Sequence, residues 1–234
     1  MQKTKTEWYF IINPHAGSGK TMSEWLPAEK ELDILGIPYK AAYTDYKSHA
    51  ITLSHEAASQ GYRKIMAVGG DGSIHEVFNG ILRWCDMTGT PPEEFYLGVI
   101  PIGSGNDWIK SLNVPHDTIR VVELLYNESF GRQDIVKMEC AGNRTCYMAN
   151  IGGIGFDSHV CKRVNFQKES GRRSKIIYIN ALRHTIFSIN PINIQLIADG
   201  KEIFSGQCYS VALGNGKYSG SGMKQVPLAE VDDG

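Results

Sequence analysis

Three glycine-rich turns follow apolar stretches in the first half of this 234-residue chain, at residues 13–21, 69–73 and 103–107. Backbone N–H groups in such turns, together with the N-terminus of a following helix, bind the oxygen atoms of phosphate groups. One turn of this kind is easily explained as a connection between two elements, but three in succession are less so. We therefore expect a phosphate-binding site, while the interpretation as ordinary connections stays open.

The turn at residues 69–73, Gly-Gly-Asp-Gly-Ser, is the sharpest of the three signals. Glycines on both sides of Asp71 permit close backbone approach, and Ser73 with the following helix N-terminus can hold an anion. The Asp71 carboxylate is placed where it could hold Mg²⁺ against that anion. Asp71 and Ser73 could also simply cap the helix, and capping uses the same geometry as phosphate binding.

Two better-known nucleotide motifs fit less well. The letters GKT at residues 19–21 match the end of a P-loop, but Pro14 stands where its first glycine belongs. The dinucleotide pattern G-x-G-x-x-G fails in the first turn because Met22 takes the place of the last glycine. In the third turn the pattern fails because Trp108 takes the place of the last glycine. A P-loop remains a minor alternative.

The elements that must position these turns alternate between strand and helix patterns. Strands are predicted at 8–12, 39–44, 65–68 and 96–100, and helices at 29–35, 48–61, 74–85 and 117–125. Gly36 should end the first helix, and Ser48 and Asp117 should cap two others. This order predicts an α/β domain with three layers, a parallel sheet between helices. Ligands bind at the carboxyl ends of such strands, so the three turns should meet at one edge.

The second half of the chain has a different period. Apolar residues alternate with polar ones at 192–198 and again at 209–213, and Asp199-Gly200 is a hairpin turn signal. These patterns predict antiparallel strands and a β-rich, sandwich-like second domain. We place the boundary near residue 133, which divides the chain into an α/β domain at 1–133 and a β-rich domain at 134–234.

The composition excludes several classes of protein. With 42% hydrophobic and 21% charged residues the chain can form a packed core. A net charge of −1 gives no general basis for nucleic-acid binding. No apolar run approaches the roughly 18 residues of a membrane-spanning helix. The N-terminus lacks the apolar core of a signal peptide, and the five cysteines have no metal-ligand spacing, so a cytoplasmic protein is expected.

Taken in order, the motifs resemble the diacylglycerol kinase catalytic-domain family, which includes bacterial soluble lipid kinases and sphingosine kinases. The matching positions are Asn13-Pro14, Gly17, Thr44, 69–73, Glu76, Asn79-Gly80, 103–107, 150–157, 214–222 and 232–234. They cover nearly the whole chain. Ser73 stands where the family more often has threonine, and this change keeps the hydroxyl group.

The resemblance implies transfer of the γ-phosphoryl group of ATP to a lipid hydroxyl such as that of diacylglycerol, with Mg²⁺. Asp71 would be the catalytic acidic residue. Residues expected to contact the nucleotide are Asn13, Gly17, Thr44, Gly70, Asp71, Gly72, Ser73, Glu76 and Ser104. Asp71, Asp107 and Asp134 would hold Mg²⁺ through water, although Asp107 could instead be a helix cap before Trp108.

The resemblance also implies features at the end of the chain. A loop with Glu230 and Asp233 would bind a structural Mg²⁺ in family members, although adjacent acids are more often a solvated turn. The family's catalytic base is a glutamate C-terminal to the Asp-Asp-Gly motif. Because this chain stops at Gly234, we expect a C-terminally truncated form with an incomplete second domain and without that base.

The lipid side has a weaker signal. Arg172, Arg173 and Lys175 precede an apolar stretch at 176–187. A basic cluster beside an apolar helical stretch can lie on an anionic membrane surface, so peripheral contact with the inner face of the membrane is expected. The favoured alternative is that the apolar stretch is a helix packed in the core, and that the basic residues before it are simply exposed to solvent. The sequence does not determine the oligomeric state, and a homodimer stays open.

Two other functions remain in view. An NAD-kinase-like enzyme shares a Gly-Gly-Asp-Gly turn, and a nucleotide-binding module without catalysis would need no base. The turns at 13–17 and 103–107 favour the lipid kinase.

Overall fold

The first half of the chain is built around β1 (Lys5–Ile12), a strand that is buried on both faces. The structure, a computed structural model, describes residues 5–103, 105–142, 144–169 and 190–234. Phe10, Ile11 and Ile12 are each at most 1% exposed. A strand without a solvent-facing side needs helices on both faces of its sheet, as in parallel α/β folds.

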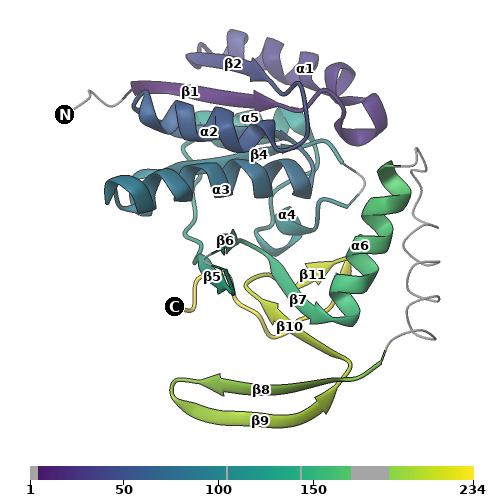
Figure 1. The fold of residues 1–234 in the computed structure, drawn as a ribbon. Coiled ribbons are helices and arrows are strands. Elements are labelled where there is room, and N and C mark those ends of the chain that lie inside the picture. The colour runs from purple at the N-terminus through teal and green to yellow at the C-terminus, as the bar shows by residue number, and fades with distance from the viewer. Residues whose placement is uncertain (1–4, 104, 143, 170–189) are drawn as a thin grey trace.

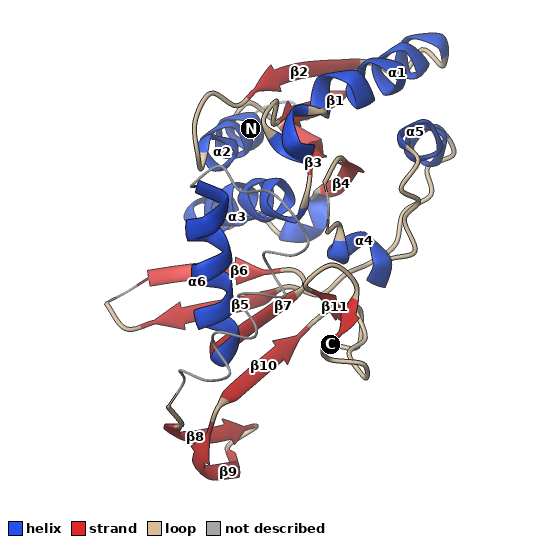
Figure 2. Cartoon of the chain, turned by 90° about the vertical axis from the view of Figure 1, so that its right-hand side faces the viewer, coloured by secondary structure: helices blue, strands red, loops and turns tan. Residues whose placement is uncertain are grey.

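The parallel sheet has the strand order β2-β1-β3-β4. The other strands are β2 (Tyr39–Tyr43), β3 (Tyr62–Gly69) and β4 (Tyr96–Pro101). One face is covered by α1 (Thr21–Ile34) and α5 (Thr118–Tyr126), and the other by α2 (His49–Ser59) and α3 (Asp71–Thr88). Figure 2 shows these helix pairs on opposite sides of the strands. The predicted three-layer α/β architecture is confirmed.

Alternation along β1 divides the core into two parts. Tyr9 and Ile11 pack toward α2 and α3, in one cluster with Val77 and Leu82. The alternate residues of β1 face α1 and α5, where Trp25 is completely buried; they are Trp8, Phe10 and Ile12. Because successive side chains of a strand point to opposite faces, the one strand contributes to both clusters.

The predicted helix at 29–35 begins earlier than expected. Its helix, α1, starts at Thr21, because Trp25 and Ala28 pack against the sheet and are 0% exposed. The sequence signal was hidden by Pro27, which lies inside the helix. Gly36 follows the end of α1 with a φ of 65°, in the left-handed region that favours glycine, so the predicted terminator is confirmed.

Ser48 and Asp117 both occupy the predicted N-cap positions, of α2 and α5, but of the two only Asp117 is confirmed as a side-chain cap. Asp117 accepts hydrogen bonds from the N–H groups of Ile119 and Arg120. Ser48 has a left-handed φ of 68°, and its side chain makes no capping hydrogen bond within the described part of the chain. A carboxylate of α3 takes its place, because Glu76 Oε1 accepts the Ser48 N–H at 3.2 Å.

The second half consists of antiparallel strand pairs, as predicted (Figure 1). The pairs are β5 (Val136–Cys140) with β6 (Arg144–Met148), β7 (Ile151–Gly155) with β10 (Ser210–Gly214), β8 (Ile192–Ala198) with β9 (Lys201–Cys208), and β11 (Tyr218–Ser219) with β12 (Met223–Lys224). The hairpin turn at Asp199-Gly200 is confirmed, with φ values of 50° and 74°. Two further helices are α4 (Asp107–Ser111) and α6 (Phe156–Glu169).

Some predictions fall outside this description. Arg172, Arg173 and Lys175, with the apolar stretch after them, lie in residues 170–189, which are not described. The predicted boundary at residue 133 lies between the end of α5 and the start of β5. In the ranges that the structure describes, no helix has both the length and the apolar character needed to cross a bilayer.

Gly80 allows α2 and α3 to approach each other closely. A β-carbon at this position would lie 2.0 Å from Ser54 Oγ and 2.3 Å from the carbonyl oxygen of Ile51. The Ile51 carbonyl belongs to the backbone of α2 and cannot move alone. The distance between the two helices is therefore possible only because Gly80 has no side chain.

We expect Gly80→Ala to lower the free energy of unfolding by about 1–3 kcal/mol, because overpacking forces the two helices apart. Urea denaturation measures this change. Gly131→Ala is the control, because a β-carbon there would meet no atom within 4 Å. Equal stability of the two variants would contradict the close-packing argument.

Candidate nucleotide-binding site

The three glycine-rich turns meet at the carboxyl edge of the parallel sheet, at its right-hand end in Figure 1. The strand order places β1 beside β3, and the chain winds outward from this pair in both directions. Such a switch point leaves a crevice beyond the strand ends, which is where open α/β sheets bind their ligands. The predicted meeting of the three turns is confirmed.

The turns touch one another through positions that lack a side chain. A β-carbon at Gly103 would lie 2.6 Å from Asn106 Oδ1 and 3.0 Å from the Cα of Gly70. One at Gly17 would lie 2.9 Å from Ile102 Cγ2. Glycine is therefore required for the second and third turns to pack backbone against backbone, and for the first turn to pack on the third.

A side-chain hydrogen bond spans the switch point. Asn13, directly after β1, donates from Nδ2 to Ser73 Oγ on α3 at 3.1 Å. The Asn13 Oδ1 atom accepts the N–H of His15 at 3.0 Å, which fixes the orientation of the amide. Ser73 accepts in this contact, so its own hydroxyl hydrogen can be donated to a second group such as a phosphate oxygen.

Asp71 binds the next turn rather than its own helix. Its Oδ1 accepts the Trp108 N–H of α4 at 3.0 Å, and the N-cap position of α3 is Gly70. Burial raises the pKa of the Asp71 carboxyl and the charge of Asp107 adds to this, while the N–H group of Trp108 opposes it. The alternative that Asp71 and Ser73 merely cap α3 is therefore wrong.

Asp107 is buried at the junction with the second half. It is 5% exposed, and its Oδ1 lies 2.6 Å from Lys110 Nζ. Its Oδ2 accepts the N–H of Ser221 at 2.8 Å. The N-cap position of α4 is Asn106, so the alternative that Asp107 caps this helix is wrong.

Two of the three carboxylates predicted for Mg²⁺ face one small space. A β-carbon at Gly105 would lie 2.9 Å from Asp71 Oδ2 and 3.7 Å from Asp107 Oδ2, so glycine leaves this space open. The third, Asp134, accepts the Gly234 N–H at 2.7 Å through Oδ2. Among the described residues no three His, Cys, Asp or Glu side chains form a direct metal-binding group. Binding through water by the three acids stays a prediction.

Asp134 also places the predicted loop with Glu230 and Asp233. The Asp134 N–H donates to the carbonyl oxygen of Val231 at 2.7 Å, so both ends of this loop are held by one residue. The C-terminus accordingly lies beside β5 in Figure 1. The structural Mg²⁺ site at Glu230 and Asp233 stays a prediction.

Thr44 follows β2, and Glu76 of α3 reaches the loop between β2 and α2. The Thr44 N–H donates to the carbonyl oxygen of Ile12 at 2.9 Å and extends the pairing of β1 with β2. Burial raises the pKa of the Glu76 carboxyl, and the N–H groups of Ser48 and Ala50 oppose the shift. Glu76 therefore holds the loop before α2. Contact of Thr44 and Glu76 with the nucleotide stays a prediction.

The structure adds residues that the sequence patterns did not single out. Lys110 Nζ donates to the carbonyl oxygen of Gly105 at 2.8 Å as well as pairing with Asp107. Asn106 Nδ2 donates to the Gly103 carbonyl at 3.0 Å and shapes the third turn. Lys110 follows an acid by three residues on a helix, a spacing that could have suggested the ion pair. Ser104, a predicted nucleotide contact, lies outside the described residues.

Comparison with known families gives two matches that together cover most of the chain. Residues 7–138 match the diacylglycerol kinase catalytic domain. Residues 151–234 match the YegS C-terminal NAD kinase beta sandwich-like domain.

Individual relatives agree with these matches. The diacylglycerol kinase of Staphylococcus aureus (strain bovine RF122 / ET3-1) is 27% identical over 228 residues, which are 96% of this chain and 67% of that protein. The candidate lipid kinase YtlR of Bacillus subtilis (strain 168) is 25% identical over 236 residues, 96% of this chain and 74% of its own length. A crystal structure of a candidate diacylglycerol kinase from Bacillus anthracis str. Sterne shares the fold, with a TM-score of 0.76 at 23% identity. That similarity covers 100% of this chain and 72% of the other.

The raised pKa of Asp71 predicts a stability change with a defined sign. A carboxyl whose native pKa exceeds its ordinary value of 3.8 binds its proton more tightly when folded, so its ionisation destabilises the native state. An asparagine side chain at this position would carry no charge, and its oxygen could still accept the Trp108 N–H. We expect Asp71→Asn to raise the free energy of unfolding at pH 7, with the gain shrinking as the pH falls toward 3.8.

Urea denaturation between pH 7 and pH 4 measures this gain. Asp199→Asn, in the exposed hairpin turn, is the matched control and should show no such gain. A loss of stability in Asp71→Asn at pH 7 would show that the carboxylate is a net stabilising group.

Proposed function

This chain belongs to the diacylglycerol kinase catalytic domain family, and on that basis we propose that it transfers the γ-phosphoryl group of ATP to a lipid hydroxyl, with Mg²⁺. The observation that carries the proposal is the convergence of three glycine-rich turns at the switch point, with Asn13 bonded to Ser73 across it. The names of the relatives support a lipid as the acceptor.

Phosphoryl transfer requires mainly that the phosphates be positioned and their charge neutralised. Gly70 and Gly103 in the packed turns remain partly exposed, so their backbone can meet a ligand, and the Ser73 hydroxyl can donate to a phosphate oxygen. Because Asn13 orients that hydroxyl, its donor direction is set before the nucleotide binds. Preorganised donors of this kind need no rearrangement as charge shifts in the transition state.

The carboxylates at the site suit a divalent cation. Asp71 and Asp107 direct oxygen atoms toward the space beside Gly105, and Mg²⁺ prefers carboxylate and water oxygens. These residues would hold Mg²⁺, with Asp134 as a third, water-mediated partner. Neutralisation of the phosphate charge is the chemistry that the ion would supply there.

A second candidate function rests on the C-terminal match, whose description names an NAD kinase beta sandwich. NAD would then be the acceptor in place of a lipid. Both candidates share the ATP site, so only the acceptor separates them.

One assay distinguishes the candidates: the protein is incubated with labelled ATP, Mg²⁺ and either diacylglycerol, sphingosine, phosphatidylglycerol or NAD. We expect label in a lipid, with diacylglycerol as the first candidate. Label in NAD alone would overturn the lipid proposal. ATP binding without transfer to any acceptor would support a non-catalytic nucleotide-binding module.

We expect Asp71→Ala to lower turnover at least about a hundredfold, because the site loses a carboxylate that would hold the Mg²⁺ at the phosphates. The fold should persist, as judged by circular dichroism. Asp33→Ala, at an exposed position of α1, is the control and should retain activity. Turnover at the parent rate in Asp71→Ala would remove Asp71 from the catalytic site.

We further propose that the protein meets its substrate at a membrane surface through the basic cluster at 172–175. Replacement of Arg172, Arg173 and Lys175 by glutamine should reduce sedimentation with vesicles that contain phosphatidylglycerol, because each basic residue near an anionic surface contributes about 1 kcal/mol. Neutral phosphatidylcholine vesicles are the control. Unchanged binding to the anionic vesicles would exclude this cluster as the contact.

A further inference from the structure

Helix α3, which begins at the candidate site, also forms hydrogen bonds with the second half of the protein at Tyr147. Asn79 of α3 donates from Nδ2 to the Tyr147 carbonyl oxygen at 3.1 Å, and its Oδ1 accepts the Tyr147 N–H at 2.9 Å. These are the two bonds that an antiparallel strand would make with Tyr147. The Asn79 side chain thus occupies the place of a neighbouring strand on the edge of β6.

The geometry of Asn79 is fixed. The residue is 2% exposed, and its Nδ2 also donates to the carbonyl oxygen of His75, one turn earlier in α3, at 2.9 Å. A buried amide bonded on three sides has little freedom to follow any movement of β6. A change in the position of α3 is therefore transmitted to Tyr147.

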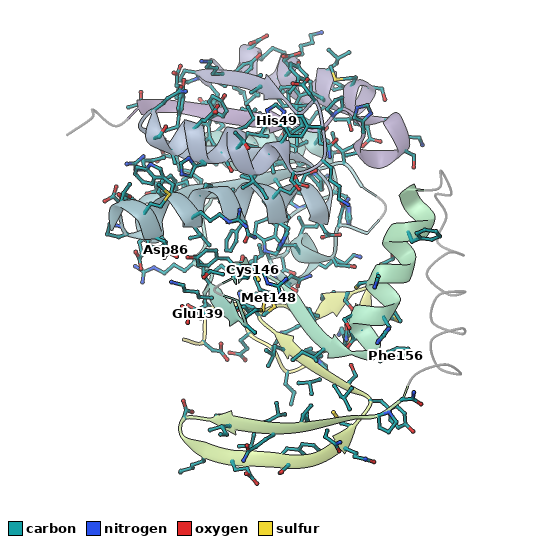
Figure 3. All side chains as sticks on the ribbon, in the orientation of Figure 1. His49, Asp86, Glu139, Cys146, Met148 and Phe156 are labelled. Atoms are coloured by element: carbon teal, nitrogen blue, oxygen red, sulfur yellow. The ribbon has the colours of Figure 1, made fainter. Side chains whose placement is uncertain are left out.

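A second contact holds the side chain of the same tyrosine. The Tyr147 hydroxyl donates to Asp86 Oδ2 at the far end of α3, and Lys137 Nζ of β5 lies 3.1 Å from the same oxygen. Burial and the Asp86 carboxylate raise the pKa of Tyr147, and the Tyr147 hydrogen bond lowers the pKa of Asp86. Figure 3 labels Asp86 on α3, and Cys146 and Met148, which flank Tyr147 on β6, at this junction.

Helix α3 therefore carries both Asp71 of the site and the two residues that contact Tyr147. Asn79 and Asp86 lie about 12 Å and 22 Å along α3 from Asp71, at 1.5 Å per residue. On the site side, the halves are joined by separate contacts, from Asp107 to the Ser221 N–H and from Ser111 Oγ to the Lys217 N–H at 2.9 Å. Two separated junctions define the orientation of one half relative to the other, whereas one junction would permit rotation.

We propose that Asn79 and Tyr147 are positioning residues for phosphoryl transfer: their contacts, which we call the α3 latch, hold the β-rich half at a fixed orientation to the nucleotide loops. The inference rests on the proposed function in one respect, that the acceptor is presented by the second half. Loss of the latch leaves the glycine-rich turns intact, so nucleotide affinity is retained. The transfer step is impaired, because the second half no longer has a fixed orientation to the nucleotide.

The test uses Asn79→Ala, which removes the backbone grip, and Tyr147→Phe, which removes only the hydroxyl contact with Asp86. Matched controls are Asn193→Ala on the exposed side of β8 and Tyr126→Phe, whose parent side chain is 58% exposed. Three quantities are measured for each variant: the dissociation constant for ATP, kcat with the accepted substrate, and hydrogen exchange of residues 136–148.

We expect Asn79→Ala to lower kcat about tenfold or more, because small misplacements of reacting groups have large kinetic effects. The ATP dissociation constant should stay within about twofold, since each of the nucleotide turns is left unchanged. Hydrogen exchange in 136–148 should accelerate in Asn79→Ala, and to a smaller extent in Tyr147→Phe. Neither control should change any of the three quantities.

The outcomes separate the latch from the function on which it rests. If the parent protein transfers phosphate to no acceptor, the proposed function fails, and hydrogen exchange still decides whether the latch joins the halves. Unchanged exchange in Asn79→Ala would overturn the latch. Faster hydrogen exchange with an unaltered kcat would show that Asn79 stabilises the junction but does not position groups for phosphoryl transfer. Global unfolding of Asn79→Ala would be recognised by exchange throughout the chain, and Tyr147→Phe then provides the test.

Discussion

The candidate site depends on one close approach, that of the Gly70 and Gly103 backbones. A β-carbon at Gly103 would lie 3.0 Å from the Cα of Gly70, so no side chain can lie between the two turns. This approach brings α3 and α4 together and lets the Asp71 carboxylate reach the Trp108 N–H. The same approach directs Asp71 and Asp107 toward the space beside Gly105. Bulkier residues in these turns would separate the acids as well as the backbone.

The Asp71 carboxylate is held at an energetic cost, which the neighbouring polar groups reduce. Burial and the charge of Asp107 raise the pKa of Asp71, and the Trp108 N–H and Lys110 offset part of that effect. Asp107 pairs with Lys110 and accepts the Ser221 N–H, and this hydrogen bond joins the two halves of the protein. A cation added beside these carboxylates would relieve their repulsion, which agrees with a Mg²⁺ role in the proposed reaction.

Much of the fold follows from local patterns, and the exceptions have physical causes. The buried strand at 8–12, the helical period at 74–85 and the turn at Asp199-Gly200 each depend on near neighbours, and each was predicted. The start of α1 was missed because Trp25 stabilises the helix through contacts with a sheet distant in the sequence. Ser48 stands at the predicted N-cap position, but the carboxylate that binds there belongs to Glu76, which lies 28 residues further along the chain and accepts the Ser48 N–H.

The sequence by itself determined which residue types meet the needs of phosphate chemistry, and that they follow successive strands. It did so because glycine turns and hydrophobic period are local properties of the chain. Only the tertiary structure decided the partners: Asp71 with the third turn, Asp134 with the loop at 231–234, and Asn79 with β6. Each of these bonds joins residues 37 or more positions apart. Their geometry is set by how the sheet, helices and second half pack, which no local pattern records.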